Sequence, residues 1–172
     1  MSVLIVNTRG ELERFIAERF RMAYGAQVKH FCTHLLGMRG AAGTWQAAAG
    51  YSPAADGALY LEHYLDRPVE AVLLDALGAP VPRAQIVEVG NLASAAKGCG
   101  GRFLLTLRRH LLARDYRWAV FTATRQVRAI LEHFAFEARA LAPAVPSRLP
   151  DGGAGWGTYY ANDPNVMAGH IG

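Results

Sequence analysis

The chain has 172 residues, of which 52% are hydrophobic and 19% are charged, and its formal net charge is +4 at pH 7. These values predict a folded domain with a substantial core and exclude a disordered chain. Lysine and arginine form no blocks, so no nucleic-acid binding is expected. The mild basic excess fits a solvated surface or a patch for an anionic partner, such as a phosphorylated cofactor or an acidic carrier protein.

Cysteine usage and apolar runs indicate the compartment. Cys32 and Cys99 lie far apart, which favours reduced thiols and a cytoplasmic protein. The first apolar run has no basic leader and is too short for a signal peptide. No window reaches the roughly 18 apolar residues of a spanning helix. We expect one domain, 1–172, with a glycine-rich C-terminal segment, 148–172; contact with a membrane surface and the oligomeric state stay open.

The chain begins with a predicted strand at residues 2–7, which is followed by a helix. Thr8 and Glu11 have the spacing of a capping box, in which a hydroxyl and a carboxylate bind the first free N–H groups of a helix. Apolar side chains then recur on one helical face, and the helix should end at Gly25.

The next segment predicts a hairpin, a strand and a second helix. Residues 29–38 and 44–52 are separated by a glycine-containing turn, as in a β-hairpin. Residues 58–64 alternate as a strand does. Asp66 is placed to cap a helix that has a proline in its first turn and ends at Gly78.

The second half predicts alternating strands and helices. Residues 85–92 form a strand, and a glycine-bearing loop leads to a helix at 101–114. Residues 117–124 are apolar on both faces, as in a covered central strand, and Thr124 can cap the helix that follows. Another strand is expected near 136–142. Right-handed crossover makes the two strands that flank helix 101–114 parallel neighbours, in an α/β (α+β) mixed sheet with helices on both faces.

A carboxylate, Glu88, lies in the middle of the strand at 85–92. Burying a carboxylate costs free energy unless it is paired or hydrogen-bonded. Two interpretations stay open: a structural anchor that meets an arginine, or a general base with a raised pKa that grips a substrate amine. Gly90 predicts a bulge or a close backbone approach, and a bulge would open a slot between the two parallel strands.

Glycines follow this strand at the start of the next helix. Backbone N–H groups of such a turn, at a helix N-terminus, can bind phosphate oxygens. The alternative is a flexible connection in which the glycines only relieve crowding. The residues of this candidate site are Lys97, Gly98, Gly100, Gly101 and Arg102.

Other side chains are weaker candidates. His30, Cys32 and His34 would share one face of a strand, but no second cluster supplies zinc ligands, so no metal is predicted. Cys99 at a helix start is interpreted as a loop cysteine without function. His63 is either a base near neutral pH or an ordinary surface or core histidine.

Six segments together resemble one protein family. They are FIAERFRMAYGA (15–26), YLEHYLDRPVE (60–70), IVEVGNLAS (86–94), FTATRQVR (121–128), RLPDGGAGWGTYY (148–160) and DPNVMAG (163–169). Over most of its length the chain resembles the thermostable hemolysin family. More distantly, it resembles the acyl-homoserine-lactone synthases and the Gcn5-related N-acetyltransferases. In this distant similarity, Asn91 takes the place of an arginine that follows a strand glutamate in the synthases.

The resemblance implies an acyltransferase fold. Such a sheet splays between two strands, here 85–92 and 117–123, and an acylated pantetheine inserts there. Gly98 and Gly100 match glycines of the family's pyrophosphate signature, whereas Ala95 stands at its first position, so acyl-coenzyme A and the phosphopantetheine of an acyl carrier protein both stay open as donors. The implied donor-binding residues are Val89, Gly90, Leu92, Lys97, Gly98, Gly100, Gly101, Arg102, Thr122 and Thr124.

The leading hypothesis is an N-acyltransferase that moves an acyl group directly from a thioester to a small amine, because no activated nucleophile is evident. Glu88 would accept the amine proton, Asn91 would polarise the thioester carbonyl, and His63 is a further catalytic candidate. A membrane-active haemolytic protein and a non-catalytic acyl-binding module are the alternatives. The candidate acceptor-binding residues, for which plain packing is the other interpretation, are Glu62, Tyr64, Trp156, Tyr159 and Tyr160.

Overall fold

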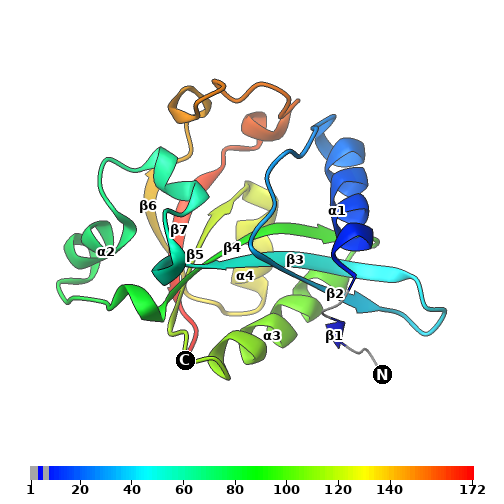
Figure 1. The fold of residues 1–172 in the computed structure, drawn as a ribbon, viewed down its shortest axis with the longest axis horizontal. Coiled ribbons are helices and arrows are strands. Elements are labelled where there is room, and N and C mark those ends of the chain that lie inside the picture. The colour runs from blue at the N-terminus through cyan, green and yellow to red at the C-terminus, as the bar shows by residue number, and fades with distance from the viewer. Residues whose placement is uncertain (1–3, 6–7) are drawn as a thin grey trace.

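The computed structural model describes residues 4–5 and 8–172, which form a mixed sheet with helices on both faces (Figure 1). The strand order is β1-β2-β3-β4-β5-β7-β6, and the predicted fold class is confirmed. The strands are β1 (Leu4–Ile5), β2 (His34–Arg39), β3 (Trp45–Pro53), β4 (Ile86–Ser94), β5 (Trp118–Ala123), β6 (Arg139–Pro143) and β7 (Asn165–His170). The α-helices are α1 (Arg9–Tyr24), α2 (Val69–Leu77), α3 (Cys99–Leu112) and α4 (Arg125–His133). Short 3-10 helices span Ala54–Asp56, Tyr60–Tyr64, Arg83–Gln85, Pro146–Arg148 and Tyr159–Asn162.

The pairing of β4 with β5 is parallel, as predicted, whereas the other neighbouring strands of the described sheet are antiparallel. α3 makes the crossover between them, which a parallel pair requires. β2 and β3 form the predicted hairpin, although β2 begins only at His34. Of the strand predicted at 2–7, Leu4–Ile5 is present as β1, and the rest lies outside the described residues.

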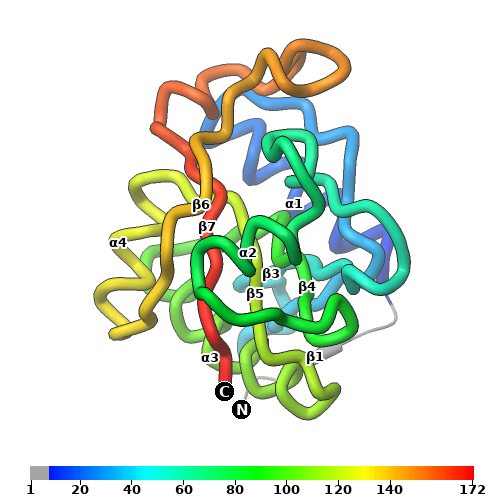
Figure 2. The backbone as a smooth tube through the Cα atoms, turned by 90° about the vertical axis from the view of Figure 1, so that its left-hand side faces the viewer, coloured from blue at the N-terminus to red at the C-terminus, as the bar shows by residue number. Residues whose placement is uncertain are grey.

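The two faces of the sheet carry different helices (Figure 2). α3 and α4 cover one face, where Phe103 packs with Val87 in a hydrophobic core cluster. α2 packs Leu73 with Ile86 on the opposite face, and α1 covers that same face beside β2 and β3. Because neighbouring side chains of a strand alternate between faces, Glu88 points to the side of α1 and α2.

Several helix ends follow the sequence. α1 ends at Gly25 and α2 ends at Gly78, each with a left-handed backbone that glycine adopts without strain. At the start of α4, the Thr124 hydroxyl accepts a hydrogen bond from the Val127 N–H at 3.4 Å. These three predictions are confirmed.

The capping box predicted at Thr8 and Glu11 is wrong. Thr8 makes no side-chain cap to α1. Glu11 instead accepts hydrogen bonds from the Arg39 guanidinium at 2.6 Å and from the Trp45 indole at 3.3 Å. A charge-assisted bond to arginine is stronger than a neutral cap bond, so the carboxylate ties α1 to the β2–β3 hairpin.

Residues 58–64 do not form the predicted strand. Tyr60–Tyr64 is a 3-10 helix whose first N–H groups bind carboxylates. The Leu59 N–H donates to Glu62 at 2.7 Å, and the Tyr60 N–H donates to Glu88 at 2.8 Å. These bonds replace the ladder partners that an extended segment needs.

The start of α2 also differs from the prediction. The Val69 N–H donates to the Glu62 carboxylate at 2.8 Å. Asp66, the predicted cap, instead forms an ion pair with Arg148 at 2.8 Å. The carboxylate of Glu62, four residues before Asp66, therefore binds N–H groups on both sides of this segment, at Leu59 and at Val69.

In the glycine-rich segment 148–172, the loop before β7 lies over the C-terminal end of α1, whereas β7 itself belongs to the sheet (Figure 1). The Gln27 N–H donates to the Gly155 carbonyl at 2.7 Å, and the Thr158 N–H donates to the Tyr24 carbonyl at 2.8 Å. The segment thereby places aromatic side chains next to those of α1. Among residues 4–5 and 8–172, no helix combines the length and apolar character needed to cross a membrane.

Candidate active site

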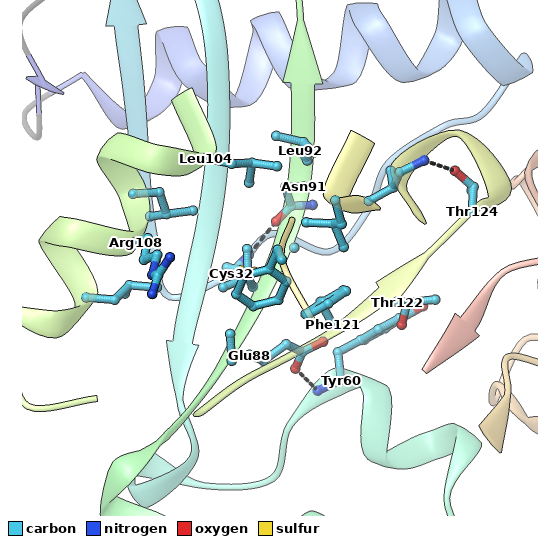
Figure 3. A pocket seen from close by; sticks show the side chains of 18 of the residues that line it. Cys32, Tyr60, Glu88, Asn91, Leu92, Leu104, Arg108, Phe121, Thr122 and Thr124 are labelled. Carbon is cyan, nitrogen blue, oxygen red and sulfur yellow. Dashed lines mark hydrogen bonds between the residues drawn. The ribbon is translucent and has the colours of Figure 1, made fainter. Parts of the chain in front are cut away.

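β4 and β5 separate halfway along their length. Their parallel register runs from Ile86–Trp118 to Val89–Phe121 and then ends, although β4 continues to Ser94. Figure 3 shows the two strands moving apart beyond Glu88. Backbone groups of β4 beyond this point therefore have no partner in the β5 ladder.

A bulge bends β4 at the same place. Toward β3, Gly90 pairs with Gly50 and Ala93 pairs with Ala48, so Asn91 and Leu92 together face one residue. Asn91 has φ +54°, a left-handed conformation that asparagine tolerates better than most residues. The bulge predicted at Gly90 therefore begins one residue later, and it turns β4 away from β5.

A cavity of about 190 Å³ passes through the gap between the strands. It is lined from both faces of the sheet and by the separated strand ends themselves. The lining on the α1–α2 face consists of Phe20, Tyr24, His30, Cys32, Tyr60, Tyr64, Glu88, Trp156 and Tyr159. The lining on the other face includes Leu104, Leu107, Leu111, Phe121, Val127, Leu131, Phe134 and Phe136.

Glu88 is the buried carboxylate of this cavity, with 6% of its surface exposed. Its oxygens accept hydrogen bonds from the Tyr60 N–H at 2.8 Å, which Figure 3 shows, and from the Leu61 N–H at 3.2 Å. Burial raises the pKa of Glu88 to about 7, with a smaller increase from Glu62, although the two N–H groups lower it. The carboxyl therefore exchanges its proton near neutral pH.

The interpretation in which an arginine anchors the Glu88 carboxylate is wrong. Among the described residues, its hydrogen-bond partners are the two backbone N–H groups of the 3-10 helix. Arg83, the nearest candidate by position, pairs with Glu62 at 2.8 Å and with Glu70 at 2.5 Å. The second interpretation, a carboxyl with a raised pKa, agrees with the geometry.

The side chain of Asn91 is occupied by a neighbouring segment. Its Oδ1 accepts from the Cys32 N–H at 2.8 Å (Figure 3), and its Nδ2 donates to the His30 carbonyl at 3.2 Å. The side chain thus fixes the cavity wall at residues 30–32. Polarisation of a carbonyl by the Asn91 amide stays a prediction, because Nδ2 carries a second N–H that these two bonds do not use.

The glycines after β4 serve different purposes. Gly98 has φ +87°, and the backbone of the turn depends on it. A Cβ on Gly101 would lie 2.1 Å from the Phe134 ring, so Gly101 makes room for that ring. The N–H groups of Gly100 and Gly101 belong to the first turn of α3, where intrahelical partners are absent. Lys97 and Arg102 are exposed on either side.

The predicted residues of the gap do line the cavity. They are Val89, Gly90, Asn91, Leu92, Gly101, Thr122 and Thr124. The Thr124 hydroxyl also caps α4, and this cap explains the residue without a role in donor binding. Lys97, Gly98, Gly100 and Arg102 lie at the α3 end, outside the lining.

Three of the four aromatic residues predicted to bind the acceptor lie together in the cavity wall. Tyr64, Trp156 and Tyr159 line the cavity, whereas Tyr160 lies behind Tyr64 and shares a hydroxyl–hydroxyl hydrogen bond with it at 2.6 Å. Burial raises the pKa of Tyr64, of Tyr159 and of Tyr160, the last to about 12. These phenols are therefore neutral at physiological pH.

Glu62 and His63 do not lie in the cavity lining. Glu62 binds Arg83 and the N–H groups of Leu59 and Val69, which makes it a structural residue and contradicts an acceptor-binding role. His63 is exposed, and its Nδ1 lies 2.8 Å from the Tyr60 carbonyl. A direct catalytic role for His63 is not supported by this position.

Two groups of lining residues were not predicted as site residues. One is the apolar side chains of α3 and α4, and the other is the ring-bearing residues of α1, the following loop and the 3-10 helix, namely Phe20, Tyr24, His30 and Tyr60. The leucines of α3 recur at helical spacing, which is the signal of a core-facing stripe. Nothing in that spacing distinguishes a filled core from a cavity wall.

Cys32 lines the cavity beside Glu88 (Figure 3). Burial, followed by the Glu88 charge, raises the pKa of Cys32 to about 12, so the thiol stays protonated. His30 and His34 instead stack on Tyr60 and Tyr51, with centroids 4.5 and 4.7 Å apart. Within the described ranges, no group of three potential ligands is placed to hold a metal.

Three similar solved structures are named as enzymes that transfer acyl groups. MesI, a CoA-dependent acyl-homoserine lactone synthase, is 16% identical at TM-score 0.61, with 100% of this chain and 89% of that chain covered. FeeM, an N-acyl amino acid synthase from uncultured soil microbes, is 11% identical at TM-score 0.61, with 99% and 91% covered. A Gcn5-related N-acetyltransferase from Kribbella flavida is 13% identical at TM-score 0.55, with 97% and 96% covered. The fold is therefore that of the Gcn5-related acyltransferases.

The chain belongs to the thermostable hemolysin family, whose model matches residues 6–172. The resemblance expected from the six sequence segments is confirmed, as is the distant similarity to acyl-homoserine-lactone synthases. A comparison with curated proteins gave no match.

Proposed function

We propose that this protein is an N-acyltransferase that moves an acyl group from a thioester donor to an amine. The observation that carries the proposal is the cavity through the gap between β4 and β5, with a buried carboxyl at its side. A thioester bound in the gap would present its carbonyl to Glu88 from one face of the sheet. The acyl chain and the amine would then approach from opposite faces.

The backbone of the gap supplies the polar contacts of the donor. N–H groups of Gly90, Asn91 and Leu92, next to the bulge and beyond the β5 ladder, are placed to hydrogen-bond the amides and the thioester carbonyl. The first turn of α3, with Lys97 and Arg102 beside it, is the proposed phosphate site. The printed name of MesI supports coenzyme A as the donor, and an acyl carrier protein is the second candidate.

The apolar half of the cavity is the proposed acyl site. Leu104 and Leu107 from α3 and Leu131 from α4 line it, with Phe121 on the strand between them. A hydrocarbon chain placed here is removed from water, and each buried CH₂ contributes about 0.8 kcal/mol. This face of the sheet therefore favours a donor with an extended acyl chain.

The chemistry follows from the position of Glu88. The carboxylate accepts one proton from the substrate ammonium, which leaves a free amine. The amine nitrogen attacks the thioester carbon, a C–N bond forms, and the C–S bond breaks. The second proton lost from nitrogen goes to the departing sulfur, which leaves as a thiol, and Glu88 releases its proton to solvent. Because the Cys32 thiol stays protonated, direct transfer is favoured over a covalent enzyme intermediate.

Substitution of Glu88 tests the catalytic assignment. Glu88→Gln keeps the size and one acceptor oxygen for the Tyr60 N–H, but it cannot take a proton. We expect kcat to fall by at least about 100-fold with unchanged donor affinity. Glu18→Gln, an exposed change on α1, is the matched control. If wild type and Glu88→Gln turn over at the same rate, Glu88 does not have the assigned catalytic role. If wild type binds the donor but acylates no amine, a non-catalytic acyl-binding module is favoured.

Titration of the donors tests the phosphate site. Octanoyl-coenzyme A and octanoylated acyl carrier protein should be compared by calorimetry. Arg102→Glu should weaken coenzyme A binding about tenfold, because it places a negative charge beside the phosphate, whereas Arg109→Glu, exposed two turns further along α3, should not. Binding of neither donor would count against the proposed function.

A further inference from the structure

The half of the cavity on the α1–α2 face is an aromatic chamber, defined here as the wall formed by Phe20, Tyr24, His30, Tyr60, Tyr64, Trp156 and Tyr159. Its members pack against one another in edge-to-face, tilted and stacked pairs: Tyr24 and Tyr159 meet edge to face with centroids 5.3 Å apart, and Trp156 and Tyr159 are tilted with centroids 5.1 Å apart. The rings come from α1, the loop that follows it, the 3-10 helix Tyr60–Tyr64 and the C-terminal segment. They present apolar faces with neutral hydroxyl and indole groups.

The charge of this chamber is unusual for a site that would bind an amino acid. Of the Asp, Glu, Lys and Arg side chains in the described part of the chain, the cavity lining includes those of Glu88 and Arg108. Arg108 lies on α3, on the opposite face of the sheet, and donates to the carbonyls of Ile171 at 2.8 Å and Gly172 at 3.4 Å. The charged group in the aromatic chamber is therefore the acid, Glu88.

Cations near the chamber are directed elsewhere. Arg148 binds Asp66 and the carbonyls of residues 63 and 65. Arg83 binds Glu62 and Glu70 on the far side of the 3-10 helix. Lys29 is exposed and outside the lining.

The imidazole of His30 does not supply the missing positive charge. Burial, and secondly His63, lower the pKa of His30, so the ring is neutral at pH 7. A substrate carboxylate in this chamber would thus be buried beside Glu88 without a counter-charge. Burying an unpaired charge costs several kcal/mol, whereas an ammonium gains from both the carboxylate and the aromatic faces.

Given the proposed function, we infer that the acyl acceptor is a primary amine without a carboxylate, with an apolar or aromatic body that packs against the chamber. The acceptor class therefore differs from the amino acid in the printed name of FeeM. Tyr24, Trp156 and Tyr159 contact the body of the acceptor, and Glu88 faces its nitrogen.

A matched set of probes isolates the carboxylate. 2-Phenylethylamine, phenylalanine and phenylalaninamide share one skeleton. On the carbon that carries the amine they have, respectively, a hydrogen, a carboxylate and a neutral amide. With octanoyl-coenzyme A as donor, we expect kcat/KM for phenylalanine to be at least about 100-fold below that for 2-phenylethylamine, and phenylalaninamide to resemble the amine. Calorimetric binding of the three probes without donor should follow the same order.

A charge added to the chamber should reverse the selectivity. His30→Arg retains stacking on Tyr60 and places a guanidinium in the wall, so phenylalanine should bind at least about tenfold more tightly than it binds to wild type. His170→Arg, the same change at the other end of the sheet on β7, should leave the order unchanged. This comparison measures binding and does not depend on turnover.

The outcomes separate the two proposals. Acylation of phenylalanine as fast as 2-phenylethylamine would overturn the inference and leave the acyltransferase function intact. Binding of none of the three probes would also overturn the inference. A third outcome is that the donor binds and the three probes bind in the expected order, but no acyl group is transferred. That outcome would contradict the proposed function and support the preference of the chamber for amines.

Discussion

At the residue scale, Glu88 determines how the reaction should depend on pH. The amine proton can be accepted only by the ionised carboxyl, and burial raises the pKa of Glu88 to about 7. We therefore expect kcat/KM to fall on the acid side with an apparent pKa near this value. Steady-state rates from pH 5 to 9 with octanoyl-coenzyme A and 2-phenylethylamine measure it. An acid limb near pH 4.5, the ordinary range of a glutamate, would contradict the assignment.

The same residue should make stability depend on pH in a defined direction. Its pKa is higher in the folded chain, about 7, than the ordinary 4.5, so the folded state holds the proton more tightly. This contribution is fully present below pH 4.5 and is lost as pH rises through 7, by about 3 kcal/mol in total. Urea unfolding at several pH values should show this loss in wild type relative to Glu88→Gln. Parallel profiles would contradict the raised pKa.

At the element scale, the 3-10 helix Tyr60–Tyr64 and the loop part of the C-terminal segment complete the site that the separated strands begin. The first aims two N–H groups at Glu88, and the second closes the aromatic chamber over α1. Gly157 is the closest point of that closure, with φ +55° and an added Cβ only 1.9 Å from the Tyr24 carbonyl oxygen. The contact leaves no space for a side chain.

Substitution at Gly157 measures how firmly the segment is held. Gly157→Ala must push the segment away from Tyr24, so the Thr158–Tyr24 hydrogen bond should break in addition to the left-handed backbone cost. Gly152→Ala, with φ +66° and open space around it, isolates the backbone cost of about 1 kcal/mol. We expect Gly157→Ala to lower the free energy of unfolding by at least about 2 kcal/mol more than Gly152→Ala. Equal losses in urea unfolding would show that the segment is loosely packed.

At the scale of the whole molecule, β4 and β5 are paired only from Ile86 to Val89, and a bound donor would bridge the part of the sheet where they have separated. A ligand that binds only the folded chain stabilises it by about 2.7 kcal/mol at 100 times its Kd. For a domain of this size, we expect saturating octanoyl-coenzyme A to raise Tm by about 5 to 10 °C. Differential scanning calorimetry with and without the donor measures the shift, and no shift would argue against a donor site in the gap.

The family description raises haemolysis as a further property of the whole molecule. If the protein is an acyltransferase, lysis should arise through an acylated product. Purified protein without donor and acceptor should therefore release no dye from liposomes, and release should begin once both substrates are present. Leakage caused by the protein alone would favour the membrane-active alternative.

Local patterns in the sequence predicted much of the sheet and its helices. The apolar strands at 85–92 and 117–124, with one helix between them, predicted a parallel pair because crossover geometry leaves few other arrangements. Gly25 and Gly78 marked helix ends, since only a residue without a Cβ takes the left-handed turn freely. The position of Glu88 within an apolar strand predicted the acid of the candidate site, because burying a carboxylate without a partner costs free energy.

Only the tertiary structure decided what surrounds that acid. The partners of Glu88 are N–H groups 27 and 28 positions away, and they belong to a segment whose alternation resembled a strand. The aromatic chamber joins α1 to the C-terminal segment, and spacing along the chain carries no information about such a contact. The spacing of hydrophobic residues and the residue types at turns reflect interactions between near neighbours in the chain, so the sequence alone predicts the elements that depend on them. The pairing of carboxylates with distant backbone, and the space left between packed elements, depend on how the whole chain fills its volume.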